Sequence, residues 1–148
     1  MSPGRAALRA VLVAVAVIAV DQAAKAIVRA QIGPFEQIRL LPGVKLVHSE
    51  NTGIAFSVLS GGGPLVVIVA VGALAALLVF FFTHLERPLV WLPTGLLLGG
   101  AAGNLIDRAR HGAVTDFIKL PHWPAFNVAD IGVTVGVLVL VYVLEKRR

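Results

Sequence analysis

Three of the chain's acidic residues, Asp107, Asp116 and Asp130, lie in one stretch between two long apolar runs. Carboxylates at the edges of membrane-length segments are energetically costly, so they are usually functional or paired with other charges. Two carboxylates that meet in a partly dry site titrate as a unit, because one of them keeps a proton. Such a pair suits hydrolysis without a metal: the ionised acid draws a proton from water while the protonated acid polarises the scissile carbonyl.

Asp116 and Asp130 are candidates for this pair. Asp116 lies in the β-favouring stretch 114–118, and Asp130 follows Asn127 at the start of an apolar run. Each has a simpler interpretation, a solvated loop carboxylate for Asp116 and a first-turn acid that complements a helix dipole for Asp130. Both acids, however, border consecutive apolar segments, and the short connection between them can bring their side chains together.

A second polar group precedes this pair. Asn104, Asp107 and Arg108 are spaced i, i+3 and i+4, so they share one face of a helix. They could act directly in catalysis. They could equally form a polar patch that holds helices together, with Asp107 neutralised by Arg108.

Other reaction chemistries find little support. The chain has no cysteine, which excludes disulfides and thiol catalysis. No nucleophile-elbow or phosphate-binding glycine motif is present. The four histidines are scattered, which argues against a zinc site: His48, His84, His111 and His122. We therefore expect neither a metal nor another cofactor.

The composition indicates an integral membrane protein. Apolar residues make up 57 % of the chain and charged residues 14 %, against about 45–50 % and about 25 % in soluble domains. The net charge of +5 includes a basic cluster at residues 146–148. That cluster is typical of a cytoplasmic membrane flank rather than of a nucleic-acid surface, so we expect membrane lipids and no nucleic acid as partners.

The apolar runs predict four transmembrane helices in a single domain, residues 1–148, at about 8–28, 65–82, 89–106 and 127–144. The first run has an alternative interpretation as a signal peptide, with a basic start and a short apolar core. Pro93 should kink the third helix or mark its first turn.

Four spans place both termini on one side. Arginine and lysine are equally numerous on the two sides, so only the terminal clusters favour the cytoplasm for the ends. Residues 31–64 and 111–126 then lie outside. Alternation at 38–40 and 44–46 around Pro42-Gly43 predicts a hairpin, and 54–59 could add a strand. The pattern fits a small amphipathic sheet on the membrane surface.

Five blocks in this order resemble the lipoprotein signal peptidases, or signal peptidase II. They are D-Q-A-A-K at 21–25, N-T-G-I-A-F-S at 51–57, G-N-L-I-D-R at 103–108, V-T-D-F at 114–117 and F-N-V-A-D at 126–130. The family often has a serine after the last aspartate, whereas Ile131 follows here. We expect this departure to affect helix packing more than the chemistry.

The resemblance implies an aspartyl endopeptidase of the bacterial inner membrane. Such enzymes remove the signal peptide of prolipoproteins just before a diacylglyceryl-modified cysteine, at the outer face. The likeness assigns the catalytic dyad to Asp116 and Asp130. It implies substrate-binding or supporting roles for a further set: Asn51, Gly53, Phe56, Asn104, Arg108, Asn127, Asp21, Lys25 and Asp107.

The sequence is thus interpreted as a mainly α membrane protein, a four-helix aspartyl peptidase with a small extracytoplasmic β-sheet that cradles the substrate. We expect a monomer. One alternative is a small proton-coupled transporter, although its acids would lie near the bilayer centre rather than at span ends. Another is a non-catalytic assembly subunit whose polar faces bind partner helices.

Overall fold

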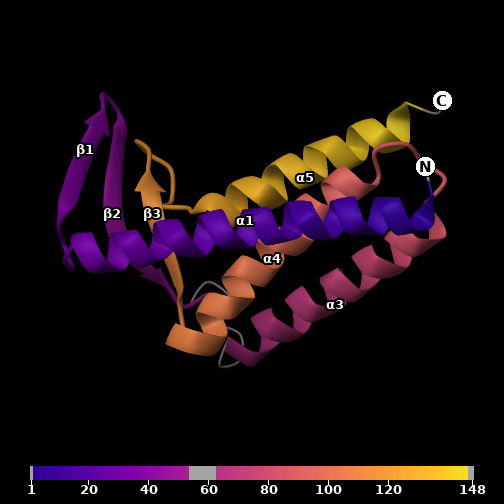
Figure 1. Cartoon of the computed structure of the whole chain (residues 1–148). Helices are drawn as coiled ribbons and strands as arrows, with labels where there is room; N and C mark the ends of the chain where they lie inside the picture. The colour runs from indigo at the N-terminus through magenta and orange to yellow at the C-terminus, as the bar shows by residue number, and fades with distance from the viewer. Residues whose placement is uncertain (1, 54–62, 147–148) are drawn as a thin grey trace.

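The computed structural model describes residues 2–53 and 63–146. The elements, in chain order, are α1 (Pro3–Gln31), β1 (Gln37–Leu41), β2 (Val44–Asn51), α3 (Gly63–Thr83), α4 (Trp91–His111), β3 (Val114–Lys119) and α5 (Val128–Glu145). The sheet lies at one end of the helices, and both termini lie at the opposite end (Figure 1). The fold is therefore mainly helical with a small sheet, as predicted.

Helix α4 packs against both α1 and α5, and its glycines make the approach close. A Cβ atom at Gly99 would lie 2.7 Å from Cβ of Val17 in α1. One at Gly100 would lie 2.8 Å from Cγ2 of Val133 in α5. The small residues at 99–103 thus allow the backbone of α4 to pack closely against α1 and α5, as expected for a run of small residues.

The sheet has the order β1-β2-β3 and is antiparallel throughout. Gly43 has a φ of 82° in the turn between β1 and β2, so the predicted hairpin is confirmed. The strand predicted at 54–59 lies outside the described residues. Leu46 and Ile118 pack against a buried cluster that contains Phe117, Val28 of α1 and Ile32, the residue directly after α1. This contact fixes the sheet to the end of α1.

The predicted count of four spans is not confirmed. Among the described residues, two helices are long and apolar enough to cross a membrane, α1 and α5, while residues 67–83 of α3 form a shorter apolar helix. Helix α4 runs to His111 rather than ending at 106, because its polar last turns continue the helix. Pro93 lies in its first turn, one of the two positions expected for it.

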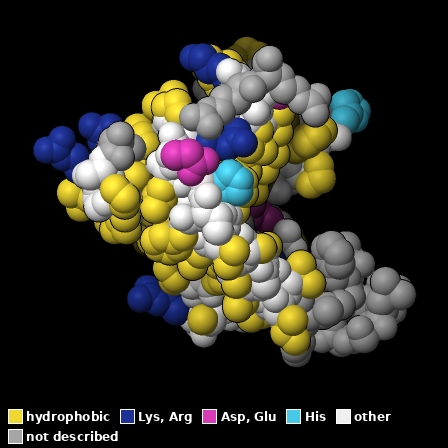
Figure 2. Space-filling model, turned by 90° about the vertical axis from the view of Figure 1, so that its right-hand side faces the viewer, with side chains coloured by type: hydrophobic (Ala, Val, Ile, Leu, Met, Phe, Trp, Pro, Cys, Tyr) yellow, Lys and Arg dark blue, Asp and Glu magenta, His cyan; other side chains and the backbone are white. Residues whose placement is uncertain are grey.

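The outer surfaces of the helices are apolar. Val11, Leu12 and Val15 of α1 are each more than half exposed, and Leu138 of α5 is 66 % exposed. Figure 2 looks onto the end where the termini lie and shows hydrophobic side chains interspersed with lysine, arginine, histidine and acidic side chains. Apolar surface of this extent suits contact with lipid.

Candidate active site

Asp116 on β3 and Asp130 at the start of α5 are held by one residue, Asn127. The Asn127 side chain donates from Nδ2 to Oδ1 of Asp116 at 2.7 Å. The backbone N–H of Asn127 donates to Oδ2 of Asp130 at 3.1 Å. The two carboxylates, which are separated along the chain by a loop, therefore lie within hydrogen-bonding reach of the same residue.

Local helix chemistry explains why Asp130 lies there. Asn127 is the N-cap of α5, and its side chain accepts the backbone N–H of Asp130 at 2.9 Å. Together with the reverse bond to Asp130, this forms a capping box. The interpretation of Asp130 as a first-turn acid is thus confirmed, and the same hydrogen bonds fix the position of its carboxylate.

Asn51, at the end of β2, orients its amide toward Asp116. Its Nδ2 donates to Oδ2 of Asp116 at 3.1 Å. Its Oδ1 accepts the backbone N–H of Gly53 at 2.9 Å, and Gly53 has a φ of 76°. Because the oxygen of the amide is occupied by Gly53, the NH₂ group faces the carboxylate. Phe56 lies outside the described residues.

A buried ion cluster supports Asp130 from the other side. Lys25 is fully buried, and its Nζ lies 2.8 Å from Oδ2 of Asp21 and 2.8 Å from Oδ2 of Asp107. The same Nζ donates to Oδ1 of Asn104 at 2.9 Å. Asn104 in turn donates from Nδ2 to Oδ1 of Asp130 at 2.9 Å. Lys25 therefore fixes which end of the Asn104 amide faces Asp130.

The expectation that Arg108 neutralises Asp107 is wrong. The ion pairs of Asp107 are with Lys25 at 2.8 Å and with Arg29 at 3.9 Å. Adjacent residues of a helix point in different directions, so Arg108 cannot follow Asp107 into the interface with α1. Within the described residues Arg108 is half-buried and has no ion pair with an acid.

Three residues near the site were not predicted from the sequence: Gln22, Arg29 and Thr115. Gln22 donates to Asp107 at 3.0 Å, Arg29 donates to the Thr115 hydroxyl at 2.9 Å, and the Thr115 N–H donates to Asp107 at 3.2 Å. The positions 22, 25 and 29 follow a helical repeat, so periodicity could have placed Gln22 and Arg29 on the face of Lys25.

Burial is the main cause that raises the pKa of Asp116 to about 6, and the nearby negative charge of Asp130 contributes to this rise. The amide donors of Asn51 and Asn127 act in the opposite direction, because they stabilise the ionised form. Asp116 is 4 % exposed. One carboxyl of the pair thus holds its proton at higher pH than an ordinary aspartate does.

A groove of about 400 Å³ begins at Asp130. It follows the exposed side of α5 and the segment that leads into it, and it is lined by Leu120, Trp123, Pro124, Ala125, Phe126, Asp130, Ile131, Thr134 and Val135. Most of these side chains are apolar. The groove therefore connects one carboxylate of the pair with the apolar outer surface of the helices.

Comparison with known proteins identifies the family. The family model described as signal peptidase (SPase) II matches residues 13–145. The chain belongs to the signal peptidase II family. It is 37 % identical over 138 residues to the lipoprotein signal peptidase of Halothermothrix orenii, covering 93 % of this chain and 95 % of that one. It is 41 % identical over 130 residues to that of Syntrophomonas wolfei, covering 86 % and 87 %.

Two solved structures share the fold, both described as bacterial membrane enzymes determined by the in meso method. One has a TM-score of 0.84 and 31 % identity over 93 % of this chain and 87 % of that chain. The other has a TM-score of 0.82 and 32 % identity over 94 % of each. The protein is thus an aspartic-type signal peptidase of the membrane, a hydrolase of lipoprotein processing. The transporter alternative is not supported.

Proposed function

We propose that this enzyme removes the signal peptide from diacylglyceryl-modified prolipoproteins, with Asp116 and Asp130 as its catalytic dyad. The observation that carries the proposal is the hydrogen bonding of both carboxylates to Asn127. It works as a monomer in the bacterial inner membrane, with the sheet and the dyad at the outer face and both termini in the cytoplasm.

The environments of the two acids support different roles in hydrolysis. Asp130 accepts two N–H donors at the N-terminus of α5, where the helix dipole favours negative charge, so it is the ionised base. Asp116 is more deeply buried and has a pKa raised to about 6, so it is the acid that holds the proton.

The reaction follows from these protonation states. Asp130 takes a proton from water as the water oxygen attacks the scissile carbonyl carbon, and Asp116 gives its proton to the carbonyl oxygen. The resulting diol collapses when Asp130 passes its proton to the amide nitrogen and Asp116 recovers one from a hydroxyl group. The carbon–nitrogen bond then breaks, and both acids return to their starting states.

The apolar groove at Asp130 supports the choice of substrate. A diacylglyceryl chain and an apolar signal peptide both reside in lipid, so the bond between them lies near the bilayer surface. The groove leads from the outer side of α5 to a carboxylate of the dyad. Asn51, Asn104 and Arg108 complete the site, where amide groups can bind an extended peptide without adding charge.

Cleavage of a diacylglyceryl-modified precursor by the purified enzyme tests this proposal. We expect Asp116→Asn and Asp130→Asn each to abolish cleavage while the protein still inserts and folds. Glu145→Gln, an exposed acid at the other end of the molecule, is the matched control and should retain full activity. Wild-type cleavage should also persist with a metal chelator. Full activity in either aspartate variant would contradict the dyad assignment.

A further inference from the structure

A row of three cations crosses the sheet. Arg39 of β1 pairs with Lys45 of β2, and Lys45 pairs with Lys119 of β3. Directly paired residues place their side chains on the same face of a sheet, and like charges in this arrangement repel one another. A row of this kind suggests that an anion binds at this face.

A row of apolar residues lies next to the row of cations in the sheet. Ile38, Leu46 and Ile118 are paired across the same three strands. Leu46 and Ile118 pack against the buried cluster at the end of α1. Because neighbouring residues of a strand point to opposite faces, Lys45 and Lys119 lie on the face of the sheet opposite to Leu46 and Ile118.

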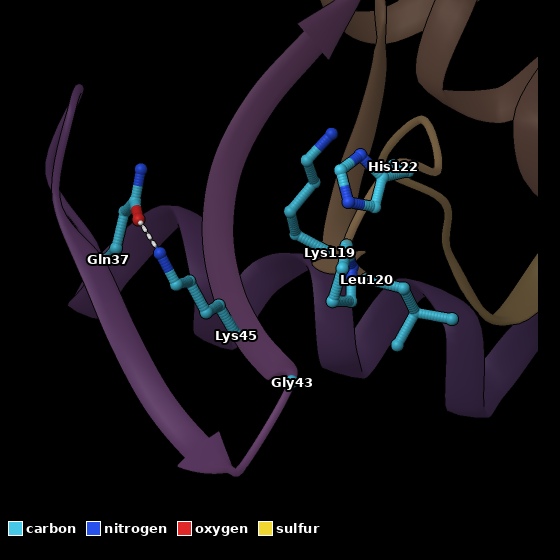
Figure 3. A pocket seen from close by; sticks show the side chains of 7 residues that line it. Gln37, Gly43, Lys45, Lys119, Leu120 and His122 are labelled. Atoms are coloured by element: carbon cyan, nitrogen blue, oxygen red, sulfur yellow. Dashed lines mark hydrogen bonds between the residues drawn. The ribbon is translucent and has the colours of Figure 1, made fainter.

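A pocket of about 260 Å³ lies on the cationic face. Its lining has no acidic residue: Gln37, Gly43, Lys45, Lys119, Leu120, Pro121 and His122. Lys119 and His122 lie side by side in the pocket, with Lys45 on the neighbouring strand bonded to Gln37 (Figure 3). The pocket therefore gathers a lysine from β2, a lysine from β3 and an imidazole from the segment after β3, while β1 contributes the neutral Gln37.

The partners of the two lysines are neutral. Lys45 donates from Nζ to Oε1 of Gln37 at 3.0 Å, and Lys119 donates to the backbone oxygen of Trp123 at 2.7 Å. Within residues 2–53 and 63–146, neither lysine has an ion pair. Each bond uses one of the three ammonium donors and leaves the positive charge uncompensated.

The position of the pocket indicates the source of the anion. Leu120 lines both this pocket and the groove that begins at Asp130. Leu41 and Trp123, which are close to the pocket in sequence, are 63 % and 62 % exposed. Exposed tryptophan beside apolar surface is typical of the headgroup level of a bilayer, where lysines bind anionic lipids.

We propose that the pocket formed by Lys45, Lys119 and His122 binds the phosphate of an anionic phospholipid headgroup. The bound lipid holds the sheet on the bilayer surface beside the groove through which substrate reaches Asp130. The site contains neither member of the proposed dyad, so it stands independently of the catalytic assignment.

Lipid retention by the purified enzyme tests the proposal, with phosphatidylglycerol and phosphatidylcholine as probes and native mass spectrometry as the readout. Wild type should retain phosphatidylglycerol in preference to phosphatidylcholine. Each lysine contributes about fivefold to the affinity, so Lys45→Gln/Lys119→Gln should lose the preference. Lys45→Arg/Lys119→Arg should keep it, as should Lys146→Gln at the opposite end of the molecule.

Two further measurements distinguish binding of a lipid headgroup from binding of a free anion, and loss of binding from misfolding of the variant. In vesicles, phosphatidylglycerol should lower the KM of wild type for precursor and leave the KM of the double glutamine variant unchanged, with equal kcat. Equal retention of phosphatidylglycerol by wild type and this variant would overturn the proposal. Displacement of the lipid by millimolar inorganic phosphate would also overturn it, because the pocket would then bind a free anion.

Discussion

Lys25 is the residue on which the polar interior depends most strongly. It is fully buried between two fully buried carboxylates, Asp21 and Asp107, and it also orients Asn104 toward Asp130. Burying two like charges without a cation between them is costly, because their repulsion is weakly screened away from water. One side chain thus neutralises a buried pair and positions an amide of the candidate site.

Replacing Lys25 by methionine should destabilise the protein by about 3–5 kcal/mol, since the substitution leaves buried charge without its partner. Thermal unfolding in detergent measures this change. The control substitution Lys146→Met removes an exposed lysine directly after the end of α5 and should leave the unfolding temperature near that of wild type. An unchanged unfolding temperature for Lys25→Met would show that the cluster does not need its cation.

The raised pKa of Asp116 predicts a pH dependence of stability. An unfolded chain titrates this group at 3.8, whereas the folded protein binds the proton already at about 6. Between these values the folded state holds more protons, so its stability rises on acidification and this contribution is lost as pH rises through 6. From pH 7.5 to 5 the group should add about 1 kcal/mol.

Thermal unfolding at the two pH values, compared between wild type and Asp116→Asn, isolates this contribution from other titrating groups. Wild type should gain stability relative to the variant at pH 5. Parallel behaviour of the two proteins would mean that Asp116 titrates as an ordinary exposed aspartate.

At the level of elements, the close packing of α4 on α5 places Asn104 opposite the start of α5. A Cβ at Gly100 would meet the backbone oxygen of Ala129 and would lie 2.8 Å from Cγ2 of Val133. Ala129 is adjacent to Asp130. The spacing of the two helices therefore determines whether Asn104 reaches the carboxylate.

Gly100→Ala should consequently lower both stability, by about 1–3 kcal/mol, and the rate of precursor cleavage. Gly72→Ala in α3 is the matched control, because a Cβ there meets nothing within 4 Å. Unfolding temperature and kcat/KM measure the two effects. Equal values for both variants would show that α4 and α5 can move apart without loss of stability or activity.

Local patterns in the sequence predicted much of the element structure. Alternating residues around Pro42-Gly43 predicted the hairpin of β1 and β2, and the apolar runs predicted all four long helices. The pairing of β3 with β2 was not predicted, because it joins segments distant in the chain and its register depends on the fold. Helix α4 continues to His111, five residues past the predicted membrane span, as the helical spacing of Asn104, Asp107 and Arg108 had indicated in part.

In the candidate site, too, contacts within one helix could be predicted from the sequence, whereas contacts between helices could not. Asp21 and Lys25 are spaced i, i+4 in one helix, a spacing that the sequence shows directly, and they form an ion pair. The partner of Asp107 could not be deduced in this way. Arg108 is its neighbour in sequence, but Lys25 comes from another helix that only the packing of α1 on α4 brings near.

For the whole molecule, the separation of its two ends supports the proposed membrane orientation. Both termini lie at one end and the sheet at the other (Figure 1). Helix α1, with 29 residues, joins these ends and is long enough to cross the hydrocarbon core. Its Lys25 is bonded to α4, so α1 is an integral part of the fold, which argues against the signal-peptide interpretation.

Single-cysteine labelling tests this orientation directly, since the natural chain contains no cysteine. We expect a membrane-impermeant maleimide to label Glu50→Cys on β2 in intact spheroplasts. Glu145→Cys at the end of α5 should be labelled only after lysis. The two positions are matched, because both are exposed glutamates in wild type. The reverse pattern would place the sheet in the cytoplasm.

Asn127 has two tasks: it caps the first turn of a helix and it holds two acids. If the first turn of α5 frays, the geometry of both carboxylates is lost at once. Heat inactivation should therefore coincide with the opening of this helix end, with no long-lived species that keeps the turn intact yet has lost the arrangement of its acids.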